Sequence, residues 1–208
     1  MPFDLWLAFV AASTALLLIP GPTVLLVLSY ALSQGRRVAL ASAGGVALGD
    51  FVAMSASLAG LGALVMTSAL AFTVLKWLGA AYLVWLGIRL LLSAEKEGLR
   101  PLPSGAAPAR GVFWHAAAVT ALNPKSIAFF IAFVPQFISV GHPIMPQFAI
   151  LIGTFVGLAA LNTLAYALLA DRLREAIARP RVTTWLARSG GAALIGMGVM
   201  TAALRRPA

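Results

Sequence analysis

The stretch Ala121-Leu122-Asn123-Pro124-Lys125-Ser126 interrupts an apolar run that extends from Gly111 to Ser139. An apolar run of this length is typical of a helix that crosses a membrane. Proline donates no backbone hydrogen bond and clashes with the preceding turn, so the helix should break here. Asn123 is a good N-cap and Pro124 is a good first helical residue. We therefore expect one half-helix to end and another to begin at mid-membrane depth, with the Lys125 ammonium group beside the new N-terminus.

A second break of the same kind lies in the first apolar run, which extends from Leu5 to Ser33. Pro20, Gly21 and Pro22 interrupt that run near its middle. Proline also occurs as a simple kink in membrane helices, so the recurrence matters more than either break alone. Irregular backbone at this depth is tolerated only where it is buried in protein or lines a wet cavity. Corresponding interruptions in the two halves of a membrane protein indicate the binding site of a transporter.

The composition is that of an integral membrane protein. The chain has 208 residues, of which 61% are hydrophobic and 10% are charged, and its mean hydropathy is +0.96. Soluble domains do not have this composition. A net charge of +9 would suggest nucleic-acid binding in a soluble protein, but here the basic residues lie between apolar runs. We therefore expect a lipid bilayer, and no nucleic acid, as the partner of this charge.

The apolar runs predict an all-α protein with six transmembrane helices. Their approximate ranges are Leu5–Gly35, Val38–Val65, Phe72–Leu92, Val112–Ile138, Pro146–Ala170 and Thr184–Leu204. The polar linker 94–110 divides one transporter domain, residues 1–208, into repeats of three helices, residues 1–93 and 111–208. The first helix of each repeat, helix 1 or helix 4, is broken by proline. Because three is an odd number, the second repeat must enter the membrane from the opposite face, which gives an inverted repeat.

Glycine spacing supports the repeat. The matching pairs are Gly45 and Gly49 with Gly153 and Gly157, and Gly79 and Gly87 with Gly190 and Gly198. Such spacing is common in any pair of packed helices, so it supports the repeat only together with the order of the breaks. The glycines of the second helix, Gly44, Gly45 and Gly49, most simply allow close helix packing, and leaving room for a ligand is a secondary role that the sequence allows.

The distribution of lysine and arginine predicts the orientation in the membrane. The loops after the first, third and fifth helices, with their flanks, hold eleven basic residues, and the other side holds three. The eleven are Arg36, Arg37, Arg89, Lys96, Arg100, Arg110, Arg172, Arg174, Arg179, Arg181 and Arg188, and the three are Lys76, Arg205 and Arg206. The positive-inside rule places the first side in the cytoplasm and therefore both termini outside it.

Asp50 is the only carboxylate that we expect at membrane depth. It lies about 12 residues into its helix and Lys125 about 14 residues into its own, so their depths differ by about 3 Å. A lone charge at this depth is costly, so both should face inward, where they can pair. Handling of substrate or protons is one interpretation, and an ion pair that locks the bundle is the other. Asn162, deep in the fifth helix, either binds substrate or bonds between helices.

Enzymatic chemistry has little support. His115 and His142 are expected far apart and the chain has no cysteine, so no metal site is predicted. Asp50 lacks the second carboxylate that an intramembrane aspartyl protease requires. No phosphate-binding loop is present, so this chain would not use ATP. We expect neither catalytic residues nor a cofactor.

Four motifs together are specific. They are Pro20-Gly21-Pro22, Gly44-Gly45-x3-Gly49-Asp50, the stretch Leu75–Gly87, and Asn123-Pro124-Lys125. In this order they resemble the LysE/RhtB family of bacterial amino-acid exporters, the LysE-type translocators, over essentially the whole chain. The resemblance implies six helices, an inner-membrane location, amino-acid efflux driven by the proton gradient, and homodimers. It does not name the substrate, because the family exports basic, hydroxylated and aliphatic amino acids.

The sequence thus predicts a secondary exporter of an amino acid or a similar small zwitterion, working by proton antiport. The N-termini of the two second half-helices, with Lys125, would hold the α-carboxylate, and Asp50 would attract the α-ammonium group or exchange a proton. The candidate binding residues are Pro20, Gly21, Pro22, Gly45, Gly49, Asp50, Asn123, Pro124, Lys125 and Asn162. The alternative is a channel or a structural membrane protein in which a buried ion pair only stabilises the bundle.

Overall fold

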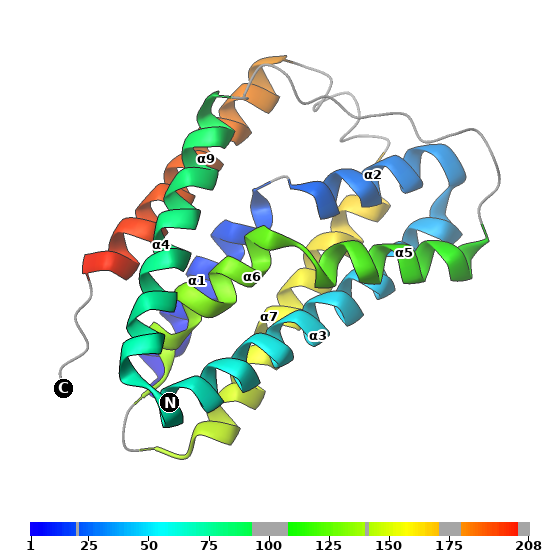
Figure 1. The fold of residues 1–208 in the computed structure, drawn as a ribbon. Helices are drawn as coiled ribbons and strands as arrows, with labels where there is room; N and C mark the ends of the chain where they lie inside the picture. Colours follow the sequence, from blue (N-terminus) through cyan, green and yellow to red (C-terminus); the bar gives the residue numbers. More distant parts are fainter. Residues whose placement is uncertain (20, 93–107, 140–141, 171–179, 204–208) are drawn as a thin grey trace.

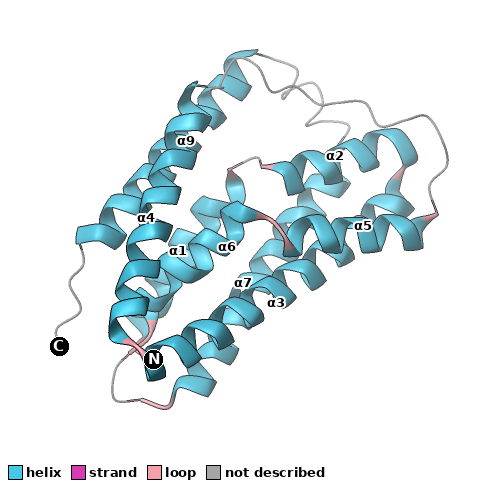
Figure 2. Cartoon of the chain, viewed as in Figure 1, coloured by secondary structure: helices cyan, strands magenta, loops and turns pink. Residues whose placement is uncertain are grey.

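The computed structural model is a bundle of α-helices (Figures 1 and 2), and it describes residues 1–19, 21–92, 108–139, 142–170 and 180–203. Its elements are α1 (Phe3–Leu18), α2 (Pro22–Gln34), α3 (Arg36–Thr67), α4 (Ala69–Leu92), α5 (Ala109–Ala121), α6 (Pro124–Ala132), the 3₁₀ turn η1 (Val134–Phe137), α7 (Ile144–Leu168) and α9 (Pro180–Ala203). These described residues form no strand, and the prediction of an all-α protein is confirmed.

Two pairs of helices meet at bends. α5 ends at Ala121 and α6 begins at Pro124, and the two axes differ by 44°. The Asn123 side chain accepts a hydrogen bond from the backbone N–H of Lys125 at 3.0 Å, so Asn123 is the N-cap of α6. α1 and α2 differ by 54°, across a break that includes Pro20, which is outside the described residues. Figure 1 displays both bends near the middle of the bundle.

Three helices are individually long and apolar enough to cross a membrane. They are α3, α4 and α7, and the number rises to five among the described residues if each bent pair is one span. α9 corresponds to the sixth predicted helix and has 24 residues, but it is less apolar and contains Arg188. The six-span inverted repeat stays a prediction. Most of the predicted linker 94–110 and the predicted helix end at Leu204 lie outside the described residues.

Glycine lets two pairs of helices approach backbone to backbone. α4 lies along α9, and α3 lies along α5 (Figure 1). A Cβ atom at Gly87 would lie 2.6 Å from the carbonyl oxygen of Gly191, and one at Gly191 would lie 2.7 Å from the carbonyl oxygen of Gly87. On α3, a Cβ atom at Gly49 would lie 2.5 Å from the carbonyl oxygen of Ala117. Small residues therefore set these two interfaces, as is usual between membrane helices.

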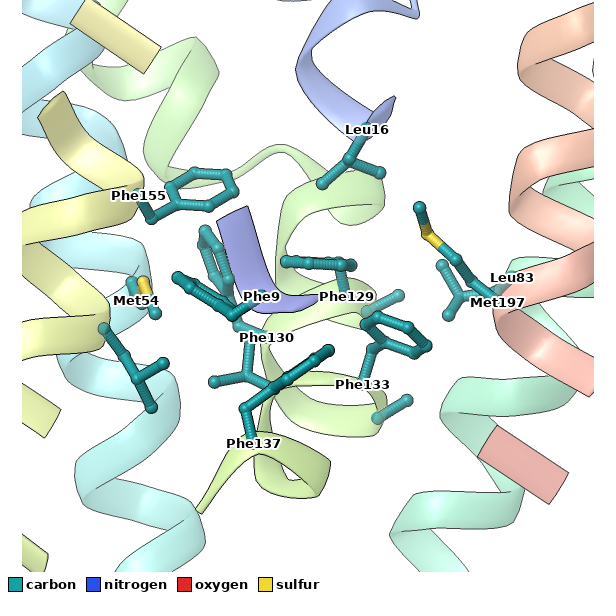
Figure 3. Close-up of a cluster of buried hydrophobic side chains, with 14 of the residues drawn as sticks. Phe9, Leu16, Met54, Leu83, Phe129, Phe130, Phe133, Phe137, Phe155 and Met197 are labelled. Atoms are coloured by element: carbon teal, nitrogen blue, oxygen red, sulfur yellow. The ribbon is translucent and has the colours of Figure 1, made fainter. Parts of the chain in front are cut away.

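A cluster of buried aromatic rings surrounds α6 (Figure 3). The ring centroids of Phe130 and Phe155 lie 4.8 Å apart, and those of Phe9 and Phe137 lie 5.3 Å apart, both edge to face. Phe9 comes from α1 and Phe155 from α7, so the cluster joins α6 to both of these helices. This core fixes the position of α6 and, with it, the break at its N-terminus.

Candidate functional site

A small cavity lies between the two helix breaks. Its volume is about 30 Å³, and its lining residues are Leu16, Leu17, Gly21, Thr23, Val24, Val46, Asp50, Asn123, Lys125, Ser126, Asn162 and Thr163. A cavity needs roughly 10–15 Å³ to hold one water molecule, so this one has room for only a few water molecules, and an amino acid does not fit in this conformation. The lining combines one carboxylate, one ammonium group, two amides and three hydroxyl groups, which is polar for the interior of a membrane protein.

The Lys125 ammonium group lies against the C-terminal end of α1. Its Nζ donates hydrogen bonds to the carbonyl oxygens of Leu16, at 3.3 Å, and Ile19, at 3.2 Å. The last carbonyls of a helix lack intrahelical partners and carry partial negative charge, so they suit a cation. Gly21 leaves room for this contact, because a Cβ atom there would lie 3.2 Å from Nζ. The carbonyl oxygens at the break between α1 and α2 therefore compensate the positive charge of Lys125 at the break between α5 and α6.

The Asp50 carboxylate lines the same cavity, and none of the described residues forms a hydrogen bond or an ion pair with it. Its residue is 3% exposed. Within the described ranges no hydrogen bond or ion pair joins it to Lys125, although the two charges are close enough to interact electrostatically. The direct pair that the depths of the two residues allow is therefore not formed in this conformation. A buried carboxylate without hydrogen bonds is costly, so it is the group in this site that most needs a ligand or a proton.

Two asparagines connect each break to the other half of the chain. The side-chain amide of Asn123 donates to the hydroxyl oxygen of Thr23 at 3.2 Å, which links the N-terminus of α6 to that of α2. The side-chain amide of Asn162 on α7 donates to the carbonyl oxygen of Leu17 at 3.1 Å. The end of α1 is thus capped by two side chains from the second half of the sequence.

Gly45 and Gly49 do not line the cavity. They face α5, where a Cβ atom at Gly45 would collide with the carbonyl oxygen of Phe113 and one at Gly49 with that of Ala117. In this conformation they allow close packing, which was the simpler of the two sequence interpretations. Their contribution to the site is indirect, because they hold α3, and hence Asp50, against the second half of the chain.

Two of the prolines mark the helix breaks. Pro22 and Pro124 are the first residues of α2 and α6, and Pro124 is exposed, whereas Pro20 lies outside the described residues. The sequence interpretation missed the three hydroxyl residues of the cavity, Thr23, Ser126 and Thr163. Two of them directly follow the broken motifs, which is a signal that could have identified them. Thr163 lies within a regular helix, and no local pattern distinguishes it.

The two histidines lie apart from this cavity. The Nδ1 atom of His115 is 2.8 Å from the hydroxyl oxygen of Tyr30, and that of His142 is 3.5 Å from the hydroxyl oxygen of Ser139. No group of three or more potential metal ligands occurs in the described part of the chain.

Comparison with known proteins identifies the family. Residues 14–204 match the LysE type translocator family. The homoserine/homoserine lactone efflux protein of Salmonella typhimurium is 35% identical over 205 residues, which cover 99% of each chain. An uncharacterized membrane protein of Vibrio cholerae is 35% identical over 207 residues, 97% of this chain and 98% of the relative. The leucine efflux protein of Klebsiella pneumoniae is 32% identical over 135 residues, 65% of this chain and 64% of the relative.

No solved structure matches the chain. The family match confirms the resemblance inferred from the four sequence motifs. The protein belongs to the LysE type translocator family, and it is a membrane transporter rather than an enzyme.

Proposed function

We propose that this protein is a secondary active exporter, which moves an amino acid or a similar small zwitterion out of the cytoplasm by proton antiport. The family and the relatives named for efflux of homoserine, homoserine lactone and leucine support this function. The observation that carries the proposal is a single cavity lined by both Asp50 and Lys125. These two groups complement the ammonium and carboxylate groups of a zwitterion.

The α-carboxylate would bind where the N-termini of α2 and α6 meet. The hydrogen bond from Asn123 to Thr23 brings these two N-termini side by side. A helix N-terminus offers unpaired N–H donors and the positive end of the helix dipole, and it therefore binds anions. Lys125, in the first turn of α6, adds a full positive charge to this region.

Asp50 would couple transport to protons. Its carboxylate can accept either a proton or the ammonium group of the substrate, and binding of one opposes binding of the other. Carboxylates buried in membrane proteins serve as proton carriers for this reason. An exporter that releases substrate when Asp50 is protonated from outside would exchange protons for substrate, as an antiporter does.

The mechanism requires the inverted repeat, with residues 1–93 and 111–208 as its two halves. In this arrangement α1–α2 and α5–α6 are the proline-broken first helices and α9 is the sixth span. The contacts of α3 with α7 and of α4 with α9 support it, because they pair the second and third helices of the two halves. Rocking of one half against the other would alternate access. The protein would lie in the inner membrane as a homodimer, with both termini outside the cytoplasm.

Counterflow in proteoliposomes tests the proposal against a channel or a structural protein. Vesicles loaded with unlabelled homoserine, or in parallel with leucine, should accumulate the labelled compound, because a carrier exchanges bound substrate across the membrane. Vesicles without protein are the control. A pH-sensitive dye inside the vesicles should report protons moving against the substrate. If no amino acid in a panel of basic, hydroxylated and aliphatic compounds exchanges, the carrier interpretation is wrong.

A further inference from the structure

The C-terminal end of α1 already holds an ammonium group. Lys125 Nζ donates to the carbonyl oxygens of Leu16 and Ile19, and the neighbouring carbonyl of Leu17 accepts from Asn162. The ammonium group reaches this end from α6, about a hundred residues away in sequence. The end of a broken helix inside a membrane protein needs such donors, because no water replaces them there.

Asp50 supplies a second, independent feature beside this end. Its buried carboxylate lines the same cavity from α3 and has no hydrogen bond or ion pair within the described ranges. A cation placed between Asp50 and the end of α1 would find acceptors on both sides. The carbonyls and the carboxylate come from different helices, so their convergence is a property of the fold and not of one motif.

We propose that the C-terminal end of α1 and Asp50 together form a binding site for a primary ammonium group. Lys125 Nζ occupies the carbonyl part of this site in the conformation described here, and the α-ammonium group of the substrate takes its place when the substrate binds. The inference rests on the proposed function only where it names an amino acid as that substrate. The roughly 30 Å³ cavity fits this view, because withdrawal of the Lys125 side chain would enlarge the site and free two carbonyls in one movement.

The site should select a ligand by the number of N–H donors on its ammonium group. A primary ammonium group has three donors and no acceptor, which suits two carbonyls and one carboxylate. The Lys125 side chain, once displaced, can turn to the α-carboxylate at the N-termini of α2 and α6. The α-ammonium group of the substrate would then replace the Lys125 ammonium group at the end of α1, and the α-carboxylate of the same substrate would become the new partner of Lys125.

The test measures binding of an amine that lacks the carboxylate. The probe is 3-aminopropan-1-ol, which is homoserine without its carboxyl group, titrated by calorimetry into the purified full-length protein. Lys125→Met removes the internal competitor and should tighten binding of the probe by roughly tenfold or more, the range expected for hydrogen bonds to a charged group. Binding of 2,4-dihydroxybutanoate, which has the carboxylate but no ammonium group, should not tighten. Unchanged or weaker binding of the amine by folded Lys125→Met overturns the proposal.

A second variant separates occupancy of the carbonyls from simple charge repulsion. Gly21→Ala keeps the charge of Lys125 but places a Cβ atom 3.2 Å from its Nζ, which must move by a few tenths of an ångström. Binding of the amine should tighten severalfold in this variant. Gly60→Ala is the matched control, because no atom lies within 4 Å of the added Cβ, and it should bind the probe as the wild type does.

The outcomes are distinct. If Lys125→Met binds the amine more tightly and Gly21→Ala does not, charge repulsion alone explains the gain and the carbonyl site is rejected. If Lys125→Met does not fold, the comparison of Gly21→Ala with Gly60→Ala decides. Counterflow of homoserine by the wild-type protein is a separate measurement. Export can therefore stand while the ammonium site fails, and the amine can bind as proposed in a protein that exports nothing.

Discussion

The close contact between α3 and α5 predicts that Gly49→Ala destabilises the protein. The new Cβ atom would lie 2.5 Å from the carbonyl oxygen of Ala117 and 2.7 Å from the Cβ atom of Thr120, whereas ordinary van der Waals contact begins at 3.4 Å. The nearest atom belongs to the backbone, so no side-chain rotation can relieve the clash. The two helices must move apart by roughly half an ångström or more, which disturbs the packing along their whole interface.

The expected cost follows from two opposing terms. Overpacking of a filled interface costs about 1–3 kcal/mol. Replacing glycine by alanine within a helix stabilises it by about 1 kcal/mol, because alanine has the higher helix propensity. Gly60→Ala, on the same helix, should have only the favourable term, since nothing lies within 4 Å of the added atom. The difference between the two variants is therefore about 1–3 kcal/mol, or about 2–12 °C in melting temperature for a chain of this size.

Thermal melting of both purified variants in one detergent measures this difference, with far-UV circular dichroism as the probe of helix content. Gly49→Ala should melt at the lower temperature and should also export less, because Asp50 is the next residue and lines the cavity. The two variants share one chemical change on one helix, so effects on the unfolded chain cancel. Equal melting temperatures, within about 1 °C, would refute the interpretation of this interface as closely packed.

Three further predictions concern the proposed transport mechanism. Asp50→Asn should fold but not export, and full export by the double variant with Lys125→Met would remove both residues from the mechanism. A reporter fused after Ala208 should be active only if it works outside the cytoplasm, and cytoplasmic activity would contradict the predicted orientation. Pro124→Ala combined with Asn123→Ala should let the helix run on and withdraw its free N–H groups. That variant should discriminate less between homoserine and 3-aminopropan-1-ol in binding, and an unchanged ratio would place the carboxylate elsewhere.

Local rules predicted the positions of the charged residues well. Asn123 caps a helix that begins at Pro124, as the residue preferences for the first helical turn require. Counting 1.5 Å per residue from the helix ends gave Asp50 and Lys125 nearly the same depth, and the cavity is lined by both. These inferences needed only the length of a membrane helix and the high energy of a charge inside it.

The partners of these residues could not be predicted in the same way. Lys125 donates hydrogen bonds to the backbone carbonyls of Leu16 and Ile19. Every residue type has such a carbonyl, so no sequence pattern predicts the contact. The role of Gly49 was equally open, because a missing side chain leaves space for a ligand or for another helix. Only the position of α5 decides between these two possibilities.

The proposed inverted repeat has a consequence for the glycines of α7. If α3 corresponds to α7 and α5 to α1, the packing of α5 on Gly45 and Gly49 corresponds to packing of α1 on Gly153 and Gly157. In this conformation the first pair is tightly covered, whereas no atom lies within 4 Å of a Cβ atom added at either member of the second pair. When one half of an inverted repeat rocks against the other, the two halves exchange their conformations, so the tightly packed glycine pair becomes the open one and the open pair becomes tightly packed. The opposite conformation should therefore pack α1 against the glycines of α7 and loosen α5 from those of α3.

Gly157→Leu tests this exchange. No atom lies within 4 Å of a Cβ atom added at Gly157, which is exposed, and leucine has the higher helix propensity, so the variant should melt no lower than the wild type. In the opposite conformation the same side chain would be overpacked at a cost of about 1–3 kcal/mol, which depletes that conformation roughly 5- to 150-fold and should slow export by a similar factor. Gly60→Leu, at another open glycine, should retain export. Wild-type export by Gly157→Leu would mean that α1 never docks on this face, and that the two halves do not exchange their packing during transport.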